Sequence, residues 1–182
     1  MARKCKIKEV DKIHAKEFLN KNHLQDYASK CNTHLGLYYD DELVQLISIT
    51  NKGFHDGNTE LTRMCTKLNT QVIGGFSKLI KNYCKLYNCN KLVSYVYKSW
   101  FNGNGYLSCG FEIVKNNPPS YYYILNNTRY HRSNFRKDRL QKMYEKNQLK
   151  YFDENDTESN ICFKNNIYKI YDCGIIKVVY NK

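Results

Sequence analysis

The sequence predicts a single α+β domain in which a mixed, mostly antiparallel central sheet is flanked by helices. Two β-rich runs, 35–39 and 43–49, are separated by a short acidic turn. Residues 60–97 follow the order strand, turn, helix, strand, and the helix has apolar residues on one face. A chain of 182 residues is close to the usual size of one domain. We therefore expect residues 1–182 to share one core.

The N-terminal part is expected to supply a helix and the antiparallel strands. Asp11 is placed to cap a first helix, because apolar residues recur behind it at near-helical spacing. The runs 35–39 and 43–49 are expected to pair as a hairpin. A third strand, around 60–67, follows a loop from 51 to 58 that is rich in Gly, Asn and Asp.

The most regular helical pattern starts at Phe76. Apolar residues recur at i, i+3 and i+4, and lysines occupy the opposite face. The apolar positions are Phe76, Leu79, Ile80, Tyr83, Cys84 and Tyr87. A β-rich run, 91–97, follows this helix directly. Together with the strand near 60–67 it predicts a βαβ unit.

The last third of the chain, 129–182, is expected to extend this domain. An aromatic run, 121–125, is typical of a strand, and an acidic segment, 153–159, is typical of a solvated loop. The final runs, 167–171 and 175–180, are expected to pair as a terminal β-hairpin.

The formal net charge is +12 and the isoelectric point is about 9.2. Such a charge raises the local concentration of polyanions, so nucleic acid or a phosphate-rich cofactor is the implied partner. An alternative stays open, because an AT-rich genome enriches Lys, Asn, Ile and Tyr without selection for binding, and the chain has 17 tyrosines.

The remaining composition favours a soluble, cytoplasmic protein. No stretch approaches the roughly 20 apolar residues that span a bilayer, so no membrane is expected as a partner. The eight cysteines are scattered without a C-x-x-C pair and are expected to be reduced and mostly buried. Cys84 and Cys89 have no second ligand pair at zinc-like spacing, so no metal is expected.

A turn before the Phe76 helix places Gly74 and Gly75 at a helix N-terminus. Glycine lets the backbone approach a ligand, and the first amides of a helix bind phosphate oxygens. A purely structural tight turn is an equally weighted alternative. A Walker-type phosphate loop is excluded, because no Gly-Lys-Ser/Thr ends the turn.

Two ordered motifs resemble the GNAT acyltransferases. The turn Gln71-x-x-Gly74-Gly75-Phe76 and the later Tyr106-x-x-x-Gly110-Phe111 match that family's Q/R-x-x-G-x-G/A turn and its Y-x-x-x-G-F helix, although the family's last small residue falls on Phe76. The resemblance implies acetyl-CoA or another acyl-CoA as cofactor, in a splayed βαβ cleft. The cofactor residues it implies are Gln71, Gly74, Gly75, Ser77, Lys78 and Asn104.

The same resemblance implies that Tyr106 protonates the departing CoA thiolate. A phenol suits this step, because its reference pKa of about 10 is similar to the basicity of a thiolate. The alternative for Tyr106 is a packed core aromatic.

Further segments resemble a phage-encoded GNAT-like family, whose members occur alone or fused to homing endonucleases and are similar in outline to the Mom DNA-modification proteins. These segments are Glu60-Leu-Thr-Arg63, Gly74-Gly-Phe-Ser-Lys78, Ser94-Tyr95, Trp100-x-x-Gly103-Asn104-x-Tyr106 and Tyr171-Asp-Cys-Gly174. That family often carries an acidic residue just after Ser-Tyr, where this chain has Tyr97. The resemblance implies a transferase in the host cytoplasm that acts on DNA, on a base flipped out of its stack.

Glu60 is the candidate base for such a reaction, and Arg63 is a candidate ligand for nucleic-acid phosphate. Their spacing of three puts them on opposite faces of a strand unless the strand bulges. A surface pair at a strand end is the alternative.

A second candidate nucleic-acid surface lies in the basic segment 129–150. The arginines 132, 136 and 139 fall at helical spacing and are expected to share one stripe of a helix. The candidate residues are Arg129, Arg132, Arg136, Lys137 and Arg139, interleaved with Tyr130, His131 and Phe135. A solvated helix face is the alternative.

Three functions follow from these observations. The first is a GNAT-type N-acyltransferase that modifies an amine on nucleic acid. The second is an N-acetyltransferase for a protein or a small amine. The third is a non-catalytic DNA-binding module derived from a homing-endonuclease fusion.

Overall fold

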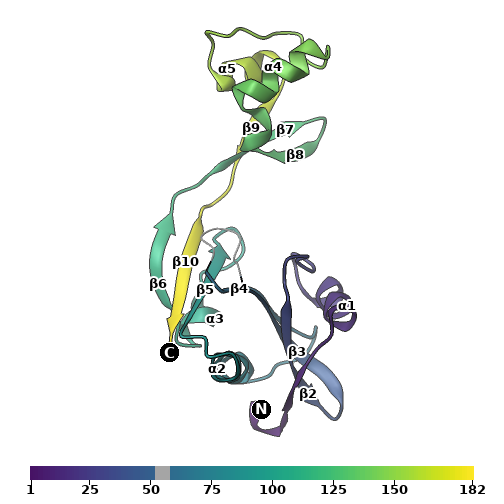
Figure 1. Cartoon of the computed structure of the whole chain (residues 1–182), viewed down its shortest axis with the longest axis vertical. Coiled ribbons are helices and arrows are strands. Elements are labelled where there is room, and N and C mark those ends of the chain that lie inside the picture. The colour runs from purple at the N-terminus through teal and green to yellow at the C-terminus, as the bar shows by residue number, and fades with distance from the viewer. Residues whose placement is uncertain (52–57) are drawn as a thin grey trace. The chain divides into compact units, whose positions relative to one another are not determined.

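The computed structural model describes residues 1–51 and 58–182 (Figure 1). The loop expected at 51–58 lies largely outside the described residues. The chain divides into two compact units, Met1–Asn116 with Ile176–Lys182, and Asn117–Ile175. The second unit therefore starts before residue 129 and ends before the last strand, whereas the sequence suggested one core with an extension from 129 to 182.

The first unit contains a seven-stranded, mostly antiparallel sheet in the order β1-β2-β3-β4-β5-β10-β6. The sheet and its flanking helices confirm the α+β class. The strands are β1 (Lys6–Glu9), β2 (Thr33–Tyr39), β3 (Glu42–Thr50), β4 (Glu60–Thr66), β5 (Lys91–Tyr97), β6 (Glu112–Asn117) and β10 (Ile175–Asn181). The pair β2–β3 is the predicted hairpin, and Asp40 and Asp41 both adopt positive φ in its turn.

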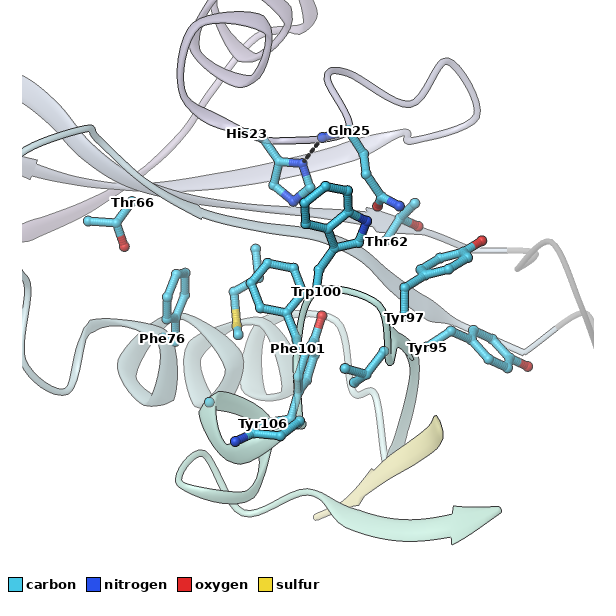
Figure 2. Close-up of a pocket in the computed structure, with 15 residues that line it drawn as sticks. His23, Gln25, Thr62, Thr66, Phe76, Tyr95, Tyr97, Trp100, Phe101 and Tyr106 are labelled. Carbon is cyan, nitrogen blue, oxygen red and sulfur yellow. Dashed lines mark hydrogen bonds between the residues drawn. The ribbon is translucent and has the colours of Figure 1, made fainter. Parts of the chain in front are cut away.

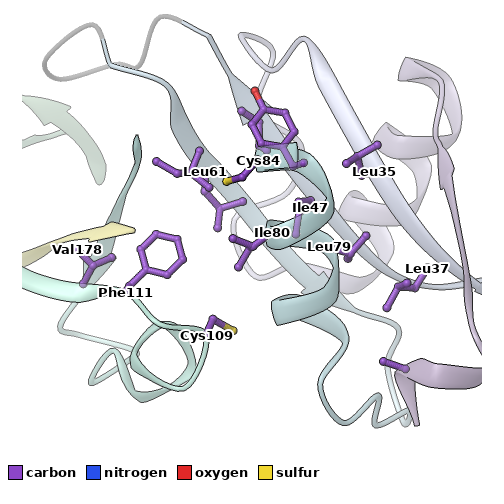
Figure 3. Packing of buried hydrophobic residues seen from close by; sticks show 14 of the residues in the cluster. Leu35, Leu37, Ile47, Leu61, Leu79, Ile80, Cys84, Cys109, Phe111 and Val178 are labelled. Carbon is purple, nitrogen blue, oxygen red and sulfur yellow. The ribbon is translucent and has the colours of Figure 1, made fainter. Parts of the chain in front are cut away.

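Two longer helices cover opposite faces of this sheet (Figure 1). On one face, Leu19 of α1 packs in a cluster with Leu46 and Cys65. On the other face, Ile80 of α2 packs in a cluster with Leu61 (Figure 3). The helical elements of this unit are η1 (Ala2–Lys4), α1 (Lys12–Asn22), α2 (Gly75–Leu86) and α3 (Asn104–Leu107).

Both predicted helices of the first unit are confirmed. The Asp11 carboxylate accepts the N–H groups of Ile13 and His14 at 3.0 Å, which satisfies donors that a helix start leaves open. The predicted βαβ unit is β4, α2 and β5, because β4 and β5 pair in parallel.

The second unit contains a three-stranded antiparallel sheet in the order β8-β7-β9. Its elements are β7 (Tyr121–Leu125), β8 (Thr128–His131), η2 (Arg132–Phe135), α4 (Lys137–Glu145), α5 (Glu158–Lys164) and β9 (Tyr168–Tyr171). One sheet face is packed through Tyr123 onto Phe135, Leu140 and Ile161. The acidic stretch is a loop only as far as Thr157, which caps α5 through its hydroxyl.

The predicted terminal hairpin is wrong. β9 pairs with β7, whereas β10 lies in the seven-stranded sheet between β5 and β6. The Asp172 carboxylate accepts the N–H groups of Ser120 and Gly174 at 2.8 Å, which ties this bend to the start of β7. The apolar residues of β10, such as Val178, join the core of the first unit. Burial of those residues therefore outweighs the local tendency of the two runs to pair.

Candidate functional site

A cavity separates β4 from β5 beyond the point where the two strands pair. The pairing is at Glu60 and Val93. Towards the C-terminal ends of the strands the cavity has a volume of about 310 Å³ (Figure 2). It is lined by His23, Gln25, Thr62, Met64, Thr66, Phe76, Tyr95, Val96, Tyr97, Trp100, Phe101, Asn102, Gly103, Gly105 and Tyr106. The two strands therefore splay apart around a site.

A β-bulge shapes the β4 wall of this cavity. Ser48 of β3 faces Arg63 and the next residue, Ile49, faces Leu61, so Thr62 is the extra residue. Leu61 and Met64 accordingly pack on the same core cluster although they are three apart. Glu60 and Arg63 lie on either side of this bulge. The extra residue between them allows their side chains to lie on the same face of the strand.

Arg63 uses its guanidinium inside the chain. Its Nε donates to the Asp26 carbonyl at 2.8 Å, Nη2 to the Gln25 carbonyl at 3.2 Å, and Nη1 to its own neighbour's carbonyl at Thr62. These bonds hold the loop after α1 against β4. The structure thus gives Arg63 a positioning role through three of its five N–H donors, and its contact with nucleic-acid phosphate stays a prediction.

Glu60 is buried at the start of β4 and does not line the cavity. Burial is the main cause that raises the pKa of Tyr106; the charge of Arg63 lowers that pKa, and the negative charge of Glu60 raises it by a smaller amount. The expected role of Glu60 as a base that contacts the acceptor therefore has no support from its position.

Tyr106 is brought to the cavity by the short helix α3, which starts after Gly103 at a φ of +88°. Its ring packs edge-on against Phe111 with centroids 5.3 Å apart. Ser94 Oγ lies 3.1 Å from the Tyr106 hydroxyl and 2.7 Å from the Leu61 carbonyl oxygen. Burial raises the pKa of Tyr106, and the hydrogen bond with Ser94 partly offsets that effect. Tyr106 is therefore a protonated group at neutral pH.

The proton of Ser94 can serve one acceptor at a time. A carbonyl oxygen only accepts, and the shorter contact of Ser94 Oγ is with the Leu61 carbonyl. Tyr106 therefore donates to Ser94 Oγ while it is protonated. If Tyr106 loses its proton, Ser94 can turn its own hydrogen to the phenolate.

The glycine turn has the geometry of an anion site. Gly74 has a φ of +74° and no atom within 4 Å of the position a Cβ would take, whereas a Cβ on Gly75 would lie 1.8 Å from Gln45 Oε1. Among the described residues, no side chain caps α2 with a hydrogen bond. The amides of Phe76 and Ser77 precede the first i→i−4 bond of this helix, from Lys78 N–H to Gly74 O. The missing side chain of Gly75 allows the first turn of α2 to pack against Gln45 of β3. The space beside Gly74 is open.

The other expected cofactor residues differ in their positions. Lys78 Nζ donates to the carbonyls of Ala2 and Cys5, at 3.0 and 2.7 Å, and so anchors the N-terminus of the chain. Gln71 is exposed in the turn, Ser77 is half-buried in the first turn of α2, and Asn104 is the exposed first residue of α3.

Phe76 lies in the cavity wall with Thr66 and Met64 (Figure 2). The bulky residue at the family's small position therefore faces the space between the strands, and also packs against the core.

Several residues of this cavity were not predicted as site residues from the sequence. His23 follows the last residue of α1. It lines the cavity together with residues of β4 and β5, which are distant in the sequence. Trp100 and Phe101 follow β5 and are 64% and 58% exposed. The signal for Trp100 was its position in the segment Trp100-x-x-Gly103-Asn104-x-Tyr106, which carries the family resemblance, and Phe101 follows it directly.

The predicted stripe of arginines on one helix is wrong. Arg129 lies in β8 and stacks over Tyr122 at 4.7 Å, whereas Arg132 lies in η2 and stacks over Tyr121 at 5.7 Å. Tyr121 and Tyr122 are neighbours in β7, so their rings point to opposite faces of the three-stranded sheet. The two arginines that stack on them therefore lie on opposite faces as well. Arg136 is extended and precedes α4.

The remaining basic residues of that segment have partners within the second unit. Arg136 Nε lies 3.7 Å from Asp138 Oδ1, and Arg139 Nη1 donates to Asn134 Oδ1 at 2.6 Å. Lys137 Nζ donates to the Glu154 carbonyl at 2.7 Å. These bonds fix the start of α4 rather than forming one basic surface.

Within residues 1–51 and 58–182, no group of three metal-binding side chains is found, and no helix is long and apolar enough to cross a membrane. The free cysteines are buried at positions 5, 31, 65, 84, 109 and 162, half-buried at Cys89 and exposed at Cys173.

The fold is similar to that of several solved acetyltransferases. An acetyltransferase of Bacillus subtilis in complex with CoA matches with a TM-score of 0.54 and 13% identity, over 98% of this chain and 99% of that chain. An IAA acetyltransferase from Bacillus cereus matches at 0.55 and 15%, over 98% and 99%. The spermidine/spermine N-acetyltransferase of Vibrio cholerae matches at 0.53 and 9%, over 99% and 94%. No protein-family model and no curated protein matches the sequence.

Proposed function

We propose that this protein is an N-acyltransferase that uses acetyl-CoA or another acyl-CoA. The observation that carries the proposal is the Tyr106 hydroxyl, which lines a cavity between two splayed strands and is held by Ser94. The GNAT fold and a CoA complex in one structural neighbour add support, although at 13% identity that likeness concerns the fold alone.

The residues present fit such a donor. Gly74 leaves open space at the N-terminus of α2, and the amides of Phe76 and Ser77 are placed to bind phosphate oxygens there. An acyl-CoA would supply a thioester whose C–S bond breaks as a bond forms from the acceptor nitrogen to the carbonyl carbon.

Tyr106 has the role of general acid in this proposal. It gives its proton to the leaving sulfur, and Ser94 then donates to the phenolate. The raised pKa of Tyr106 keeps the proton available at neutral pH. The acceptor nitrogen loses its proton to solvent, and Tyr106 regains one, so the products are an amide and a thiol.

An amine on nucleic acid is the acceptor that the net charge of +12 favours. A protein or small amine is the second candidate, and the polyamine-modifying structural neighbour is an example of such an enzyme. The arginines of the second unit do not form one basic stripe. A nucleic-acid acceptor is therefore supported by the net charge of the whole chain and not by a local surface.

The phage origin, the host cytoplasm and the kinship with DNA-modifying or homing-endonuclease proteins rest on sequence resemblance. If no acyl-CoA binds, the remaining candidate is a non-catalytic DNA-binding module. Arg129 stacked on Tyr122 is the observation that favours this binding module, because such a pair can stack on a base.

Calorimetric titration with acetyl-CoA, together with a DNA gel shift at several salt concentrations, separates these functions. Binding of acetyl-CoA, followed by release of free thiol in the presence of an amine, is the result expected for the enzyme. Absence of heat with acetyl-CoA, combined with salt-sensitive DNA binding, would exclude the enzyme and leave the binding module.

A further inference from the structure

We infer that the acceptor end of the β4–β5 cavity takes a flat, uncharged aromatic amine rather than an alkyl ammonium ion. The inference deepens the proposed function and rests on it for the reaction, but the binding site itself is testable without the donor. It follows from the division of the cavity, the protonation of His23 and the nature of the lining side chains.

The cavity has two ends on either side of Tyr106. Phe76 and Thr66 line the end beside the glycine turn, where a donor with phosphates would enter. His23, Trp100 and Tyr97 line the other end (Figure 2). Because Tyr106 must reach the leaving sulfur, the donor ends at this residue, and the space beyond it is left for the acceptor.

His23 is a neutral hydrogen-bond donor at this acceptor end. Its Nδ1 accepts the backbone N–H of Gln25 at 3.0 Å, so the ring proton of the neutral form resides on Nε2. Burial, and then the positive charge of Arg63, lower the pKa of His23 to about 4. At neutral pH the ring therefore offers an N–H to the acceptor and has no free lone pair with which to remove a proton.

Two charged residues of the described chain, Arg63 and Asp26, act on the pKa of His23. Arg63 holds the loop that carries it, and Asp26 in the same loop opposes the effect of Arg63 on its pKa. Among the described residues, no side chain that lines the cavity is a carboxylate, an ammonium or a guanidinium.

This lining disfavours a cationic acceptor. An ammonium ion would have to give up its solvation without a carboxylate among the described lining residues to replace it. It would also have to lose a proton before attack, and phenols, amides and aliphatic hydroxyls do not take a proton from an ammonium at neutral pH. An amine on an aromatic ring avoids both costs, because its lone pair is delocalised and the group is uncharged.

The walls also suit a flat ring. Tyr95, Tyr97, Trp100 and Phe101 line the cavity with aromatic rings, and the last two are more than half exposed to solvent. Stacking of one ring on such a face contributes about 1–3 kcal/mol. The whole cavity, at about 310 Å³, is at the small end for ligand pockets, and its acceptor end is only part of that volume, so it suits one compact ring at most.

Trp100 gives a direct assay, because it is the only tryptophan of the chain. Aniline, adenosine and cytidine are titrated into the full chain without donor, with spermidine and a lysine peptide as the cationic arm. Quenching of the tryptophan emission by at least one aromatic amine, and by neither cationic amine, is expected. Quenching by aniline but by neither nucleoside would indicate a simple arylamine as the acceptor. Quenching by adenosine or cytidine as well would indicate a nucleobase.

The same panel is then tested for release of free thiol from acetyl-CoA. Phe101→Ala should weaken the aromatic amine about 5- to 150-fold, whereas Phe163→Ala, an equally exposed aromatic in α5 of the second unit, should have no effect. Quenching without any thiol release would count against the proposed transferase but not against this site. No quenching by any aromatic amine, or faster acetylation of spermidine or the lysine peptide, would overturn the inference.

Discussion

Replacement of Ser94 by Ala tests the link between this serine and Tyr106. Ser94 is 1% exposed, and its Oγ lies between the Leu61 carbonyl and the Tyr106 hydroxyl. A hydrogen bond to a charged group contributes about 1.5–3 kcal/mol. If Ser94 stabilises the phenolate that forms as Tyr106 gives up its proton, Ser94→Ala should slow acyl transfer roughly 10- to 150-fold.

The pH profile distinguishes this role from a loss of packing. Tyr106 must be protonated to act as an acid, so activity should be present below its pKa and lost as the pH rises through it. The hydrogen bond with Ser94 lowers that pKa, so Ser94→Ala should move the alkaline loss of activity to higher pH while it lowers the plateau. Ser108→Ala removes a hydroxyl that donates to the Gly105 carbonyl at 3.0 Å and serves as the control. A slower variant with an unmoved alkaline limb would refute the reasoning.

Three further variants test individual contacts. Gly75→Ala should lower the free energy of unfolding by about 1–3 kcal/mol in denaturant titrations, because its Cβ would overlap Gln45; an unchanged midpoint would contradict the packing at the start of α2. Lys78→Ala should cost about 1–3 kcal/mol in the same assay, because two carbonyls lose a donor, but should leave the affinity for acetyl-CoA unchanged; a large loss of affinity would restore the phosphate role. The depressed pKa of His23 means that the unfolded chain binds its proton first, so stability should fall between about pH 6.5 and pH 4, and His23→Asn should show a smaller fall in melting temperature over that window; equal falls would place the effect elsewhere.

The sequence predicted those elements whose cause is local. The helix α2 follows from apolar residues at helical spacing, the start of α1 from Asp11, and the β2–β3 turn from two neighbouring aspartates that tolerate positive φ. The glycine turn was found because an unusual backbone conformation restricts residue type.

Contacts between segments that are distant in the sequence could not be predicted from local residue patterns. Lys78 appeared to be a phosphate ligand, yet its partners are carbonyls more than 70 positions earlier in the chain. His23 became a site residue only when the loop after α1 met the cavity, and Ser94 lay within a segment that carries the family resemblance but had no predicted role. The last strand followed the core of the first unit rather than its sequence neighbour, because burial of Val178 there gains more than a solvent-exposed hairpin would.

Titration of CoA into the isotope-labelled chain, followed by backbone amide NMR, tests the central claim most directly. Our account predicts the largest shift changes at the amides of Phe76 and Ser77, with smaller ones along Thr62–Thr66 of β4. An unchanged spectrum, or changes confined to residues 117–175, would contradict a donor site between β4 and β5.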